Sequence, residues 1–347
     1  MHDFSKLSQL GWRTHFQQQL SLQELETQQA YRVIAQHRSG YQLAGVSGEY
    51  HLAIGHSMPL ITVGDWLLLN NDMSFYRLLK RTSLFSRKAP GSKLDTQLIA
   101  ANVDTAFIVC SLNYDFNLGR IERYLSLVNQ ANVEPVLVLS KLDVCTDPDI
   151  YIDQLKQLNS NLIIEQVNGL DASSTSVLQP WCKDGQTVVF IGSSGVGKST
   201  LANTLANSET FATGGIREDD SKGRHTTTSR ALKQIALGGL LLDTPGMREL
   251  QLTDCEHGVS STFDDIQKLE QQCRFNNCQH QNQPGCAVTA AIEAGELEPR
   301  RLLNYQKLLR EQANNTASLA EKRAHFKSQT KMYRNIQTES RKRKKNN

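Results

Sequence analysis

The spacing of hydrophobic residues divides the chain into two unlike parts. Between Tyr31 and about Lys88, short runs in strand-like patterns are separated by turn residues, which is typical of a small β domain. From about Asn102 onward, longer apolar runs alternate with segments that have helical periodicity. The pattern therefore predicts an N-terminal β domain followed by an α/β domain.

The first part favours a Greek-key barrel of the OB type, because short strands follow one another closely. The predicted strands are AYRVIAQ, YQLAGVSG, YHLAIG, ITVGDWLLL and SFYRLLKR, and a short Gln- and Leu-rich helix is expected within the first 26 residues. Barrels of this type often bind nucleic acid, although a scaffold barrel would show the same pattern. Basic residues near its end offer phosphate contacts, namely Arg77, Lys80, Arg81, Arg87 and Lys88.

The second part alternates apolar strands with amphipathic helices. VDTAFIVCSL, EPVLVLSKLD, NLIIEQ and TVVFIG predict strands, and LKQIALGGLLLDTPG predicts one more. GRIERYLSLVNQAN has the periodicity of a helix with one apolar face. Such alternation indicates a parallel, doubly wound sheet, whose ligands bind at the carboxyl ends of the strands.

A glycine-rich loop follows one of these strands and precedes a helix. Residues 192–199, GSSGVGKS, match the P-loop pattern G-x-x-x-x-G-K-S. Glycines let backbone N–H groups surround phosphates, and the helix N-terminus faces the same anion. Lys198 is expected to reach the β- and γ-phosphates, and the Ser199 hydroxyl to bind Mg²⁺. The predicted phosphate-binding residues are Gly192, Ser193, Ser194, Gly195, Val196, Gly197, Lys198, Ser199 and Thr200.

Two later segments are expected to complete the magnesium site. In the tetrapeptide DTPG at 243–246, Asp243 would hold Mg²⁺ through water and the Gly246 amide would sense the γ-phosphate. The polar segment GRHTTT at 223–228 matches the position of a mobile loop in GTPases. Its Thr227, or alternatively Thr226, would complete the Mg²⁺ shell when GTP is bound.

A base-recognition segment favours GTP over ATP. SKLD at 140–143 follows an apolar strand and matches the guanine-binding pattern Asn/Thr-Lys-x-Asp except at Ser140. Asp143 would accept hydrogen bonds from N1–H and the N2 amine of guanine, and Lys141 would lie along the base. Adenine lacks both donors and would leave the carboxylate unpaired. After the next strand, Asn168 and Gly169 are expected to supply the amide that contacts guanine O6.

The order of these segments is circularly permuted. GTPases ordinarily run from P-loop through mobile loop and DxxG to the base segment, whereas here the base segment comes first. A permuted chain can close the same site in three dimensions. The permutation also places DTPG directly upstream of the C-terminal region, so movement around the γ-phosphate can pass to that region.

The C-terminal region contains a cluster of metal ligands. Cys273, Cys278, His280 and Cys286 have the spacing Cys-x4-Cys-x-His-x5-Cys. Three thiolates and one imidazole form a closed tetrahedral set, which indicates one structural Zn²⁺ and no open catalytic position. The other cysteines lack such spacing and are predicted to be buried thiols, namely Cys110, Cys145, Cys182 and Cys255.

Composition and charge refine this interpretation. With 39% apolar and 21% charged residues in 347 positions, and no apolar run of membrane-spanning length or signal peptide, the sequence predicts a cytoplasmic protein without a membrane partner. Residues 301–347 contain 13 Lys or Arg against 3 Asp or Glu, so the first 300 residues carry a net charge of −7. The basic end would bind a polyanion, or it is a solvated tail without a partner.

The permuted order, the GRHTTT loop and the cysteine spacing together resemble the bacterial ribosome small-subunit-dependent GTPases. The resemblance covers roughly residues 30–335 and includes AANVD at 100–104 and KMY at 331–333. It implies an α/β multidomain fold with an OB barrel, a permuted GTPase domain and a helical zinc domain. It also implies late maturation of the 30S subunit, contact with 16S rRNA, and hydrolysis of GTP to GDP stimulated by that subunit.

These expectations give a domain division and a catalytic candidate. The division is an N-terminal extension at 1–26, a barrel at 27–95, a GTPase domain at 96–256, a zinc domain at 257–315 and a basic tail at 316–347. Met247 stands where many GTPases have a water-orienting Gln, so His225 is the catalytic candidate, as has also been suggested for the family. We expect a monomer.

Two other functions fit the same residues. The chain would be an rRNA-binding assembly factor if GTP served only as a conformational ligand, or a P-loop ATPase if SKLD does not bind a base.

Overall fold

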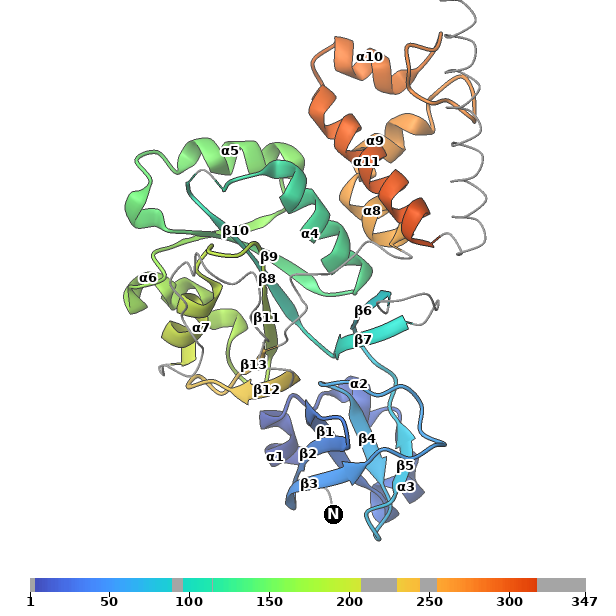
Figure 1. The fold of residues 1–347 in the computed structure, drawn as a ribbon, viewed down its shortest axis with the longest axis vertical. Helices are drawn as coiled ribbons and strands as arrows, with labels where there is room; N and C mark the ends of the chain where they lie inside the picture. Colours follow the sequence, from blue (N-terminus) through green and yellow to red (C-terminus); the bar gives the residue numbers. More distant parts are fainter. Residues whose placement is uncertain (1–3, 89–95, 114, 207–229, 244–254, 317–347) are drawn as a thin grey trace, which may run out of the picture.

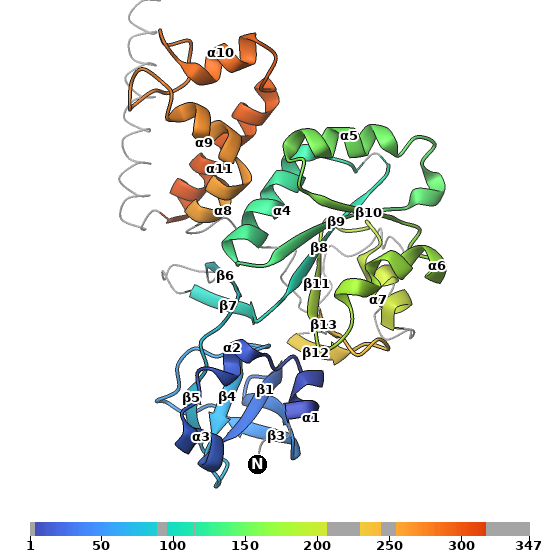
Figure 2. The ribbon, with the colours of Figure 1, turned by 180° about the vertical axis from the view of Figure 1, so that it is seen from behind.

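We analysed the protein in a computed structural model, which describes residues 4–88, 96–113, 115–206, 230–243 and 255–316. An N-terminal β domain, a central α/β domain and a helical C-terminal module follow one another along the chain (Figure 1). The C-terminal module lies beside the central domain and the N-terminal domain lies beyond one end of its sheet (Figure 2).

The chain begins with three short helices, where the sequence predicted one. They are α1 (Phe4–Gln9), α2 (Thr14–Gln17) and α3 (Leu22–Thr27). The chain changes direction after α1 at Gly11, whose φ of 85° lies in the left-handed region. Ser21 and Glu24 form a reciprocal capping box that starts α3. Leu7, Trp12 and Phe16 pack on Trp66, so this segment belongs to the core of the β domain.

The β domain contains the predicted strands as one antiparallel sheet in the order β3-β2-β1-β4-β5. The strands are β1 (Gln29–Gln36), β2 (Gly40–Gly45), β3 (Gly48–Ala53), β4 (Trp66–Leu69) and β5 (Phe75–Leu78). The segment ITVG, predicted as part of β4, lies outside it because the chain turns at Gly64, with a φ of 92°. This strand order is compatible with an OB barrel, but closure between β3 and β5 is not among the described pairings and stays a prediction.

A hairpin of β6 (Leu84–Lys88) and β7 (Thr96–Ala101) leads into the central domain. There the sheet order is β10-β9-β8-β11-β13-β12. The parallel strands are β8 (Thr105–Ser111), β9 (Glu134–Ser140), β10 (Ile163–Val167), β11 (Thr187–Ile191) and β13 (Leu240–Asp243). Helices cover both faces, so the predicted doubly wound sheet is confirmed.

The segment LKQIALGGLLLD forms two strands, where the sequence predicted one. Strand β12 (Arg230–Gln234) runs antiparallel to β13. The chain reverses at Gly238, whose φ is 81° and whose N–H donates to the Ile235 carbonyl at 2.9 Å. A Cβ on the following Gly239 would lie 2.3 Å from the Cys182 carbonyl oxygen, so this turn requires glycine.

The helices divide between the two faces of this sheet. Helices α4 (Leu118–Gln130) and α5 (Asp149–Leu158) pack on the face that includes Ile108 and Leu137. Helix α7 (Lys198–Ala206) and the 3₁₀ helix η2 (Ser176–Trp181), preceded by α6 (Ala172–Thr175), lie on the opposite face. The alternation of strand side chains thus fills two separate cores.

The C-terminal module contains α8 (Glu256–Thr262), α9 (Asp264–Glu270), α10 (Ala287–Glu293) and α11 (Pro299–Thr316). Its buried residues, such as Phe263 and Leu302, belong to the same core as α4. At the contact, a Cβ on Gly258 would lie 2.0 Å from the Ser126 carbonyl oxygen, so α8 approaches α4 closely because residue 258 is glycine. The module is therefore packed on the central domain.

The N-terminal and central domains are also joined, through β1 and a buried arginine. Strand β1 pairs with β12, with Ala35 opposite Ala231, so the two sheets are continuous. Arg32 of β1 is 1% exposed and donates to the Asn102 carbonyl at 3.1 Å and to Thr187 Oγ1 at 2.9 Å. Burial lowers the pKa of Arg32 to about 10, which still leaves the guanidinium charged near neutral pH.

Candidate nucleotide site and metal centre

The predicted nucleotide segments leave the sheet at the carboxyl ends of neighbouring strands. Ser111 and Val167 are both register partners of Ser140, so β8, β9 and β10 end together. Strand β11 is parallel to β8 and ends at Ile191, directly before the glycine loop. The sheet therefore brings residues 140–143, 168–169 and 192–199 to one edge, as the sequence predicted.

The glycine loop has the backbone that its sequence predicts. It runs from Ile191 at the end of β11 to Lys198 at the start of α7. Its three glycines, Gly192, Gly195 and Gly197, have φ values of 150°, 79° and 95°. A Cβ on Gly192 would lie 2.4 Å from the Val109 carbonyl oxygen, so no other residue fits there without displacement.

Two residues hold this loop from inside. Val196 is 1% exposed and packs in the core beneath α7. Lys198 Nζ donates to the Gly192 carbonyl at 2.8 Å and also to the Ser193 carbonyl. The ammonium group therefore lies within the loop, beside the backbone that would surround a phosphate.

Ser140 joins the base segment to the glycine loop. It ends β9, is 1% exposed, and its Oγ donates to the Val196 carbonyl at 2.6 Å. The residue that departs from the Asn/Thr-Lys-x-Asp pattern thus makes a direct hydrogen bond to the loop. After it, Lys141 has a left-handed φ of 61° and Asp143 is exposed in the 3₁₀ turn η1 (Leu142–Val144).

We expect Ser140→Ala to weaken GDP binding by about 3- to 10-fold, because a buried carbonyl would lose its partner. Isothermal titration calorimetry of GDP with the full chain measures this effect. Ser140→Thr, which keeps the hydroxyl, serves as the matched variant and should bind more tightly than Ser140→Ala. An alanine variant that folds and binds GDP like the parent chain would show that the hydrogen bond from Ser140 to Val196 does not contribute to GDP affinity.

The segment after β10 is hydrogen-bonded to the helix that follows the glycine loop. The Gly169 carbonyl accepts a hydrogen bond from Thr204 Oγ1 of α7 at 2.8 Å. The Asn168 N–H donates to Ser174 Oγ at 2.8 Å, and its side chain accepts from the Leu170 N–H at 3.1 Å. Of the two predicted O6-contacting residues, Gly169 is thus held by α7 and Asn168 by α6.

Sequence reasoning missed a set of residues from α4 that contacts the glycine loop. Arg120 donates to Ser193 Oγ and to Asp115 Oδ1, the latter at 2.7 Å. Tyr124 also hydrogen-bonds Ser193; burial raises the pKa of this phenol and the hydrogen bond opposes the shift. Asn117 caps α4 by accepting from the Arg120 N–H at 2.9 Å. The i, i+4 spacing of Arg120 and Tyr124 was the signal that both side chains lie on one face of this helix.

Several predicted site residues lie outside the described part of the chain. These are Gly246, His225, Thr226 and Thr227. Strand β13 brings the backbone of Asp243 to the end of the sheet beside β11, but its side chain is not described.

The four predicted zinc ligands come together in the C-terminal module. The ligand atoms of Cys273, Cys278, His280 and Cys286 all lie within 4.8 Å of one another. His280 Nδ1 is 3.4 Å from Cys286 Sγ, and Cys273 Sγ is 4.0 Å from Cys286 Sγ. A tetrahedron with Zn–S bonds of about 2.3 Å has edges of similar length. The donor set and its spacing fit zinc.

The surroundings of the cluster orient its ligands, and sequence reasoning missed them. His280 Nε2 lies 2.9 Å from Glu270 Oε1, which leaves Nδ1 facing the cysteines. Tyr305 Oη donates to the other Glu270 oxygen at 3.1 Å. Although burial opposes it, hydrogen bonding with Thr289 and His280 lowers the pKa of Cys286 to about 6, which favours the thiolate. Glu270 precedes the ligands closely, but nothing in the sequence marks Tyr305.

The remaining cysteines have the predicted character, with one exception. Cys110, Cys182 and Cys255 are buried, and burial raises the pKa of each thiol to about 12. Cys145 is only partly buried.

The model of the RsgA GTPase family matches residues 78–253, from the end of the β domain to the DTPG segment. The chain belongs to this family. An ABC transporter model also matches residues 178–340, a range that contains the strand, glycine loop and helix shared by P-loop proteins. In the part of the chain that the structure describes, no helix is long and apolar enough to cross a membrane.

Relatives with this RsgA GTPase domain extend along nearly the whole chain. The chain is 62% identical over 337 residues to "Small ribosomal subunit biogenesis GTPase RsgA 2" of Vibrio parahaemolyticus, covering 97% of this chain and 94% of the relative. It is 45% identical over 299 residues to the RsgA of Xanthomonas axonopodis pv. citri, covering 83% and 82%.

Two solved structures share the fold of this RsgA family member. YjeQ from Thermotoga maritima has a TM-score of 0.60 at 23% identity and covers 82% of this chain and 98% of that one. YloQ, described as a circularly permuted GTPase, has a TM-score of 0.58 at 23% identity and covers 84% and 96%. The likeness confirms the permuted GTPase fold predicted from the order of the motifs.

Proposed function

We propose that this chain is a GTP hydrolase that acts in late maturation of the 30S ribosomal subunit and is stimulated by that subunit. The observation that carries the proposal is 62% identity, along 97% of the chain, with a small ribosomal subunit biogenesis GTPase. The meeting of a glycine loop and a guanine-type base segment at one sheet edge supports the same activity. GTP and GDP are the expected ligands.

In this proposal, residues of the predicted segments bind the nucleotide and Mg²⁺. Residues 192–200 hold the phosphates, while Lys141 and Asp143 select guanine with help from Asn168 and Gly169. Ser199, together with Asp243 and Thr227, holds Mg²⁺, which neutralises charge that develops on the phosphates. The phosphate-binding role is supported by the backbone of the loop, and its link to the base segment by the hydrogen bond from Ser140 to the Val196 carbonyl.

Hydrolysis also needs an oriented water molecule. We assign this role to His225, because Met247 has no side-chain group that can hold water. Turnover by the chain alone is expected to be slow and to rise when the small subunit binds. The second expected cation is a single structural Zn²⁺ held by Cys273, Cys278, His280 and Cys286.

The 16S rRNA is the expected surface on which the protein docks, as a cytoplasmic monomer. Of the basic residues of the β domain, Arg77 bonds Glu24 at 2.6 Å and Arg81 bonds Asp65 at 2.7 Å. These carboxylates leave less positive charge for phosphate than the sequence suggested. Residues 316–347 carry much of the remaining basic charge, and we assign them to the RNA contact.

Cosedimentation with purified small subunits tests this proposal. With a non-hydrolysable GTP analogue, the full chain is expected to pellet with the subunits, and with GDP the bound fraction should fall. Large subunits serve as the control for nonspecific binding to RNA, and the salt concentration must be held fixed. Equal binding to both subunits in every nucleotide state would refute the proposed partner.

A further inference from the structure

Helix α4 contacts both the nucleotide edge and the C-terminal module. Its first turn carries Arg120, which holds Ser193 of the glycine loop. Other residues of α4 contact the module: Glu122 contacts α11, and Gln130 Oε1, at the end of α4, accepts from the Gly258 N–H of α8 at 2.9 Å. The same rigid helix thus lies between two parts of the protein that are far apart in sequence.

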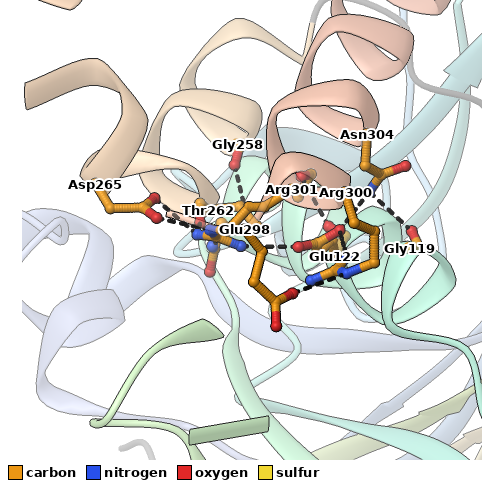
Figure 3. A network of polar contacts seen from close by, with 11 residues as sticks. Gly119, Glu122, Gly258, Thr262, Asp265, Glu298, Arg300, Arg301 and Asn304 are labelled. Carbon is orange, nitrogen blue, oxygen red and sulfur yellow. Dashed lines mark hydrogen bonds and ion pairs between the residues drawn. The ribbon is translucent and has the colours of Figure 1, made fainter. Parts of the chain in front are cut away.

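Glu122 is a buried carboxylate with three donors from α11. It has no solvent-exposed side-chain surface, and it accepts from Arg301 Nη1 at 2.8 Å and from Arg300 Nη1 at 3.1 Å. The side-chain amide of Asn304 donates to the same carboxylate (Figure 3). A buried charge is tolerated only when its partners compensate for lost hydration, so this geometry specifies how α11 sits on α4.

Arg301 extends the contact to α8 and α9. Its side chain is 5% exposed and donates to the two Asp265 carboxylate oxygens at 2.6 and 2.8 Å (Figure 3). It also donates to the Thr262 carbonyl at 2.9 Å and stacks 4.8 Å from the Phe263 ring centroid. One guanidinium therefore joins α4 to the other helices around it, and a shift of the module would break several bonds together.

The opposite end of the connection is the glycine loop. Ser193 contacts Arg120 and Tyr124 of α4 through its hydroxyl, and its carbonyl accepts from Lys198 Nζ. Because Ser193 is part of the loop backbone, displacement of Arg120 would also displace N–H groups that face the phosphates. Asp115, at 2.7 Å from Arg120, fixes the direction of the guanidinium.

We propose that Glu122 and Arg301 are positioning residues of the nucleotide site. Their ion pair fixes α4 on the C-terminal module, and α4 in turn holds Arg120 against Ser193. The inference rests on the proposed nucleotide-binding role of residues 192–200. It makes the C-terminal module part of the machinery that sets nucleotide affinity, although the module does not itself contact the loop through these residues. Because coupling between sites is reciprocal, nucleotide also stabilises the packing of the module.

Titration of fluorescently labelled GDP with the full chain tests the proposal. Glu122→Gln keeps the shape of the side chain but removes its charge, and we expect the Kd for GDP to rise about 5- to 20-fold. Lys268→Gln is the matched control, because its ion pair with Asp264 lies within α9 and is exposed. Zinc content and thermal unfolding show whether each variant is folded. Should Glu122→Gln fail to fold, Arg300→Gln, which removes one donor at a partly exposed position, carries the same test.

A double-mutant cycle separates positioning from a general loss of structure. Arg120→Ala should itself weaken GDP binding, and adding Glu122→Gln to it should cause little further loss, because both act through one contact. Independent, additive effects, or a folded Glu122→Gln chain with parental affinity, would overturn the inference. Failure of the parent chain to bind GDP would instead contradict the proposed nucleotide site.

Discussion

Lys198→Ala is expected to reduce GTP turnover by about 100- to 1,000-fold, the size of effect seen when a group that stabilises transition-state charge is removed. In the structure, Lys198 Nζ bonds the Gly192 and Ser193 carbonyls inside the loop, so its charge is available where phosphate oxygens would lie. Alanine removes the charge and leaves both carbonyls without this donor. Release of inorganic phosphate at saturating GTP, with and without small subunits, measures the change.

The control for this variant is an exposed lysine in another helix of the same domain. Lys156 lies exposed near the end of α5, away from the glycine loop. Lys156→Ala should keep parental turnover and parental affinity for GDP. If Lys198→Ala folds and still hydrolyses GTP at the parental rate, the loop at 192–199 is not the phosphate site.

Cys286→Ser is expected to remove the bound zinc and to lower the free energy of unfolding by more than about 4 kcal/mol, because metal loss is among the few changes with such large effects. Cys286 is 5% exposed and lies at the centre of the cluster, within 4.0 Å of Cys273 Sγ and 3.4 Å of His280 Nδ1. The core of the module is continuous with α4, so loss of packing in the module is expected to destabilise the central domain as well.

Zinc analysis of the purified protein and thermal unfolding check this expectation together. The parent chain should carry one zinc ion, and Cys286→Ser should carry less. Cys145→Ser is the matched control, because Cys145 is partly buried and lies outside the cluster; its effect should be about 1 kcal/mol or less. A Cys286→Ser chain with full zinc content and parental stability would argue against the metal centre.

The sequence alone predicted the features that depend on local chemistry. Residues 192–199 need a strand before them, a helix after them and glycines at fixed positions, and all of these are visible in the chain itself. A doubly wound sheet then places the carboxyl ends of its parallel strands at one edge, which is why residues 140–143 could be predicted to share a site with residues 192–199. The cysteine spacing likewise predicted four side chains that the structure brings together, because the motif is short.

The predicted strand boundaries were wrong where the chain turns at a glycine inside a segment that the sequence predicted to be one strand. ITVGDWLLL was predicted as one strand, but the chain turns at Gly64, with a φ of 92°, and only Trp66–Leu69 form β4. LKQIALGGLLLD was likewise predicted as one strand, yet Gly238 and Gly239 fold it into a hairpin. Hydrophobic pattern reports burial, and it does not report the direction of the chain.

Long-range polar contacts could not be predicted at all. Glu122 occupies a charged position in GRIERYL, where a helix charge is normally solvated, yet it is fully buried against α11. Arg32 sits in the strand AYRVIAQ and is buried at the junction of two domains. In both cases the partner lies many residues away, and only the tertiary structure shows that the charge has one.

The measurement that tests the central claim most directly is turnover of GTP and of ATP by the purified full chain, with and without small ribosomal subunits, at one stated salt concentration. We predict slow, GTP-selective turnover by the chain alone and a sharp rise when small subunits are added. GTP binding without any rise would contradict the claim and favour an assembly factor that uses GTP only as a conformational ligand. Turnover of ATP would contradict the assignment of residues 140–143 to the guanine base.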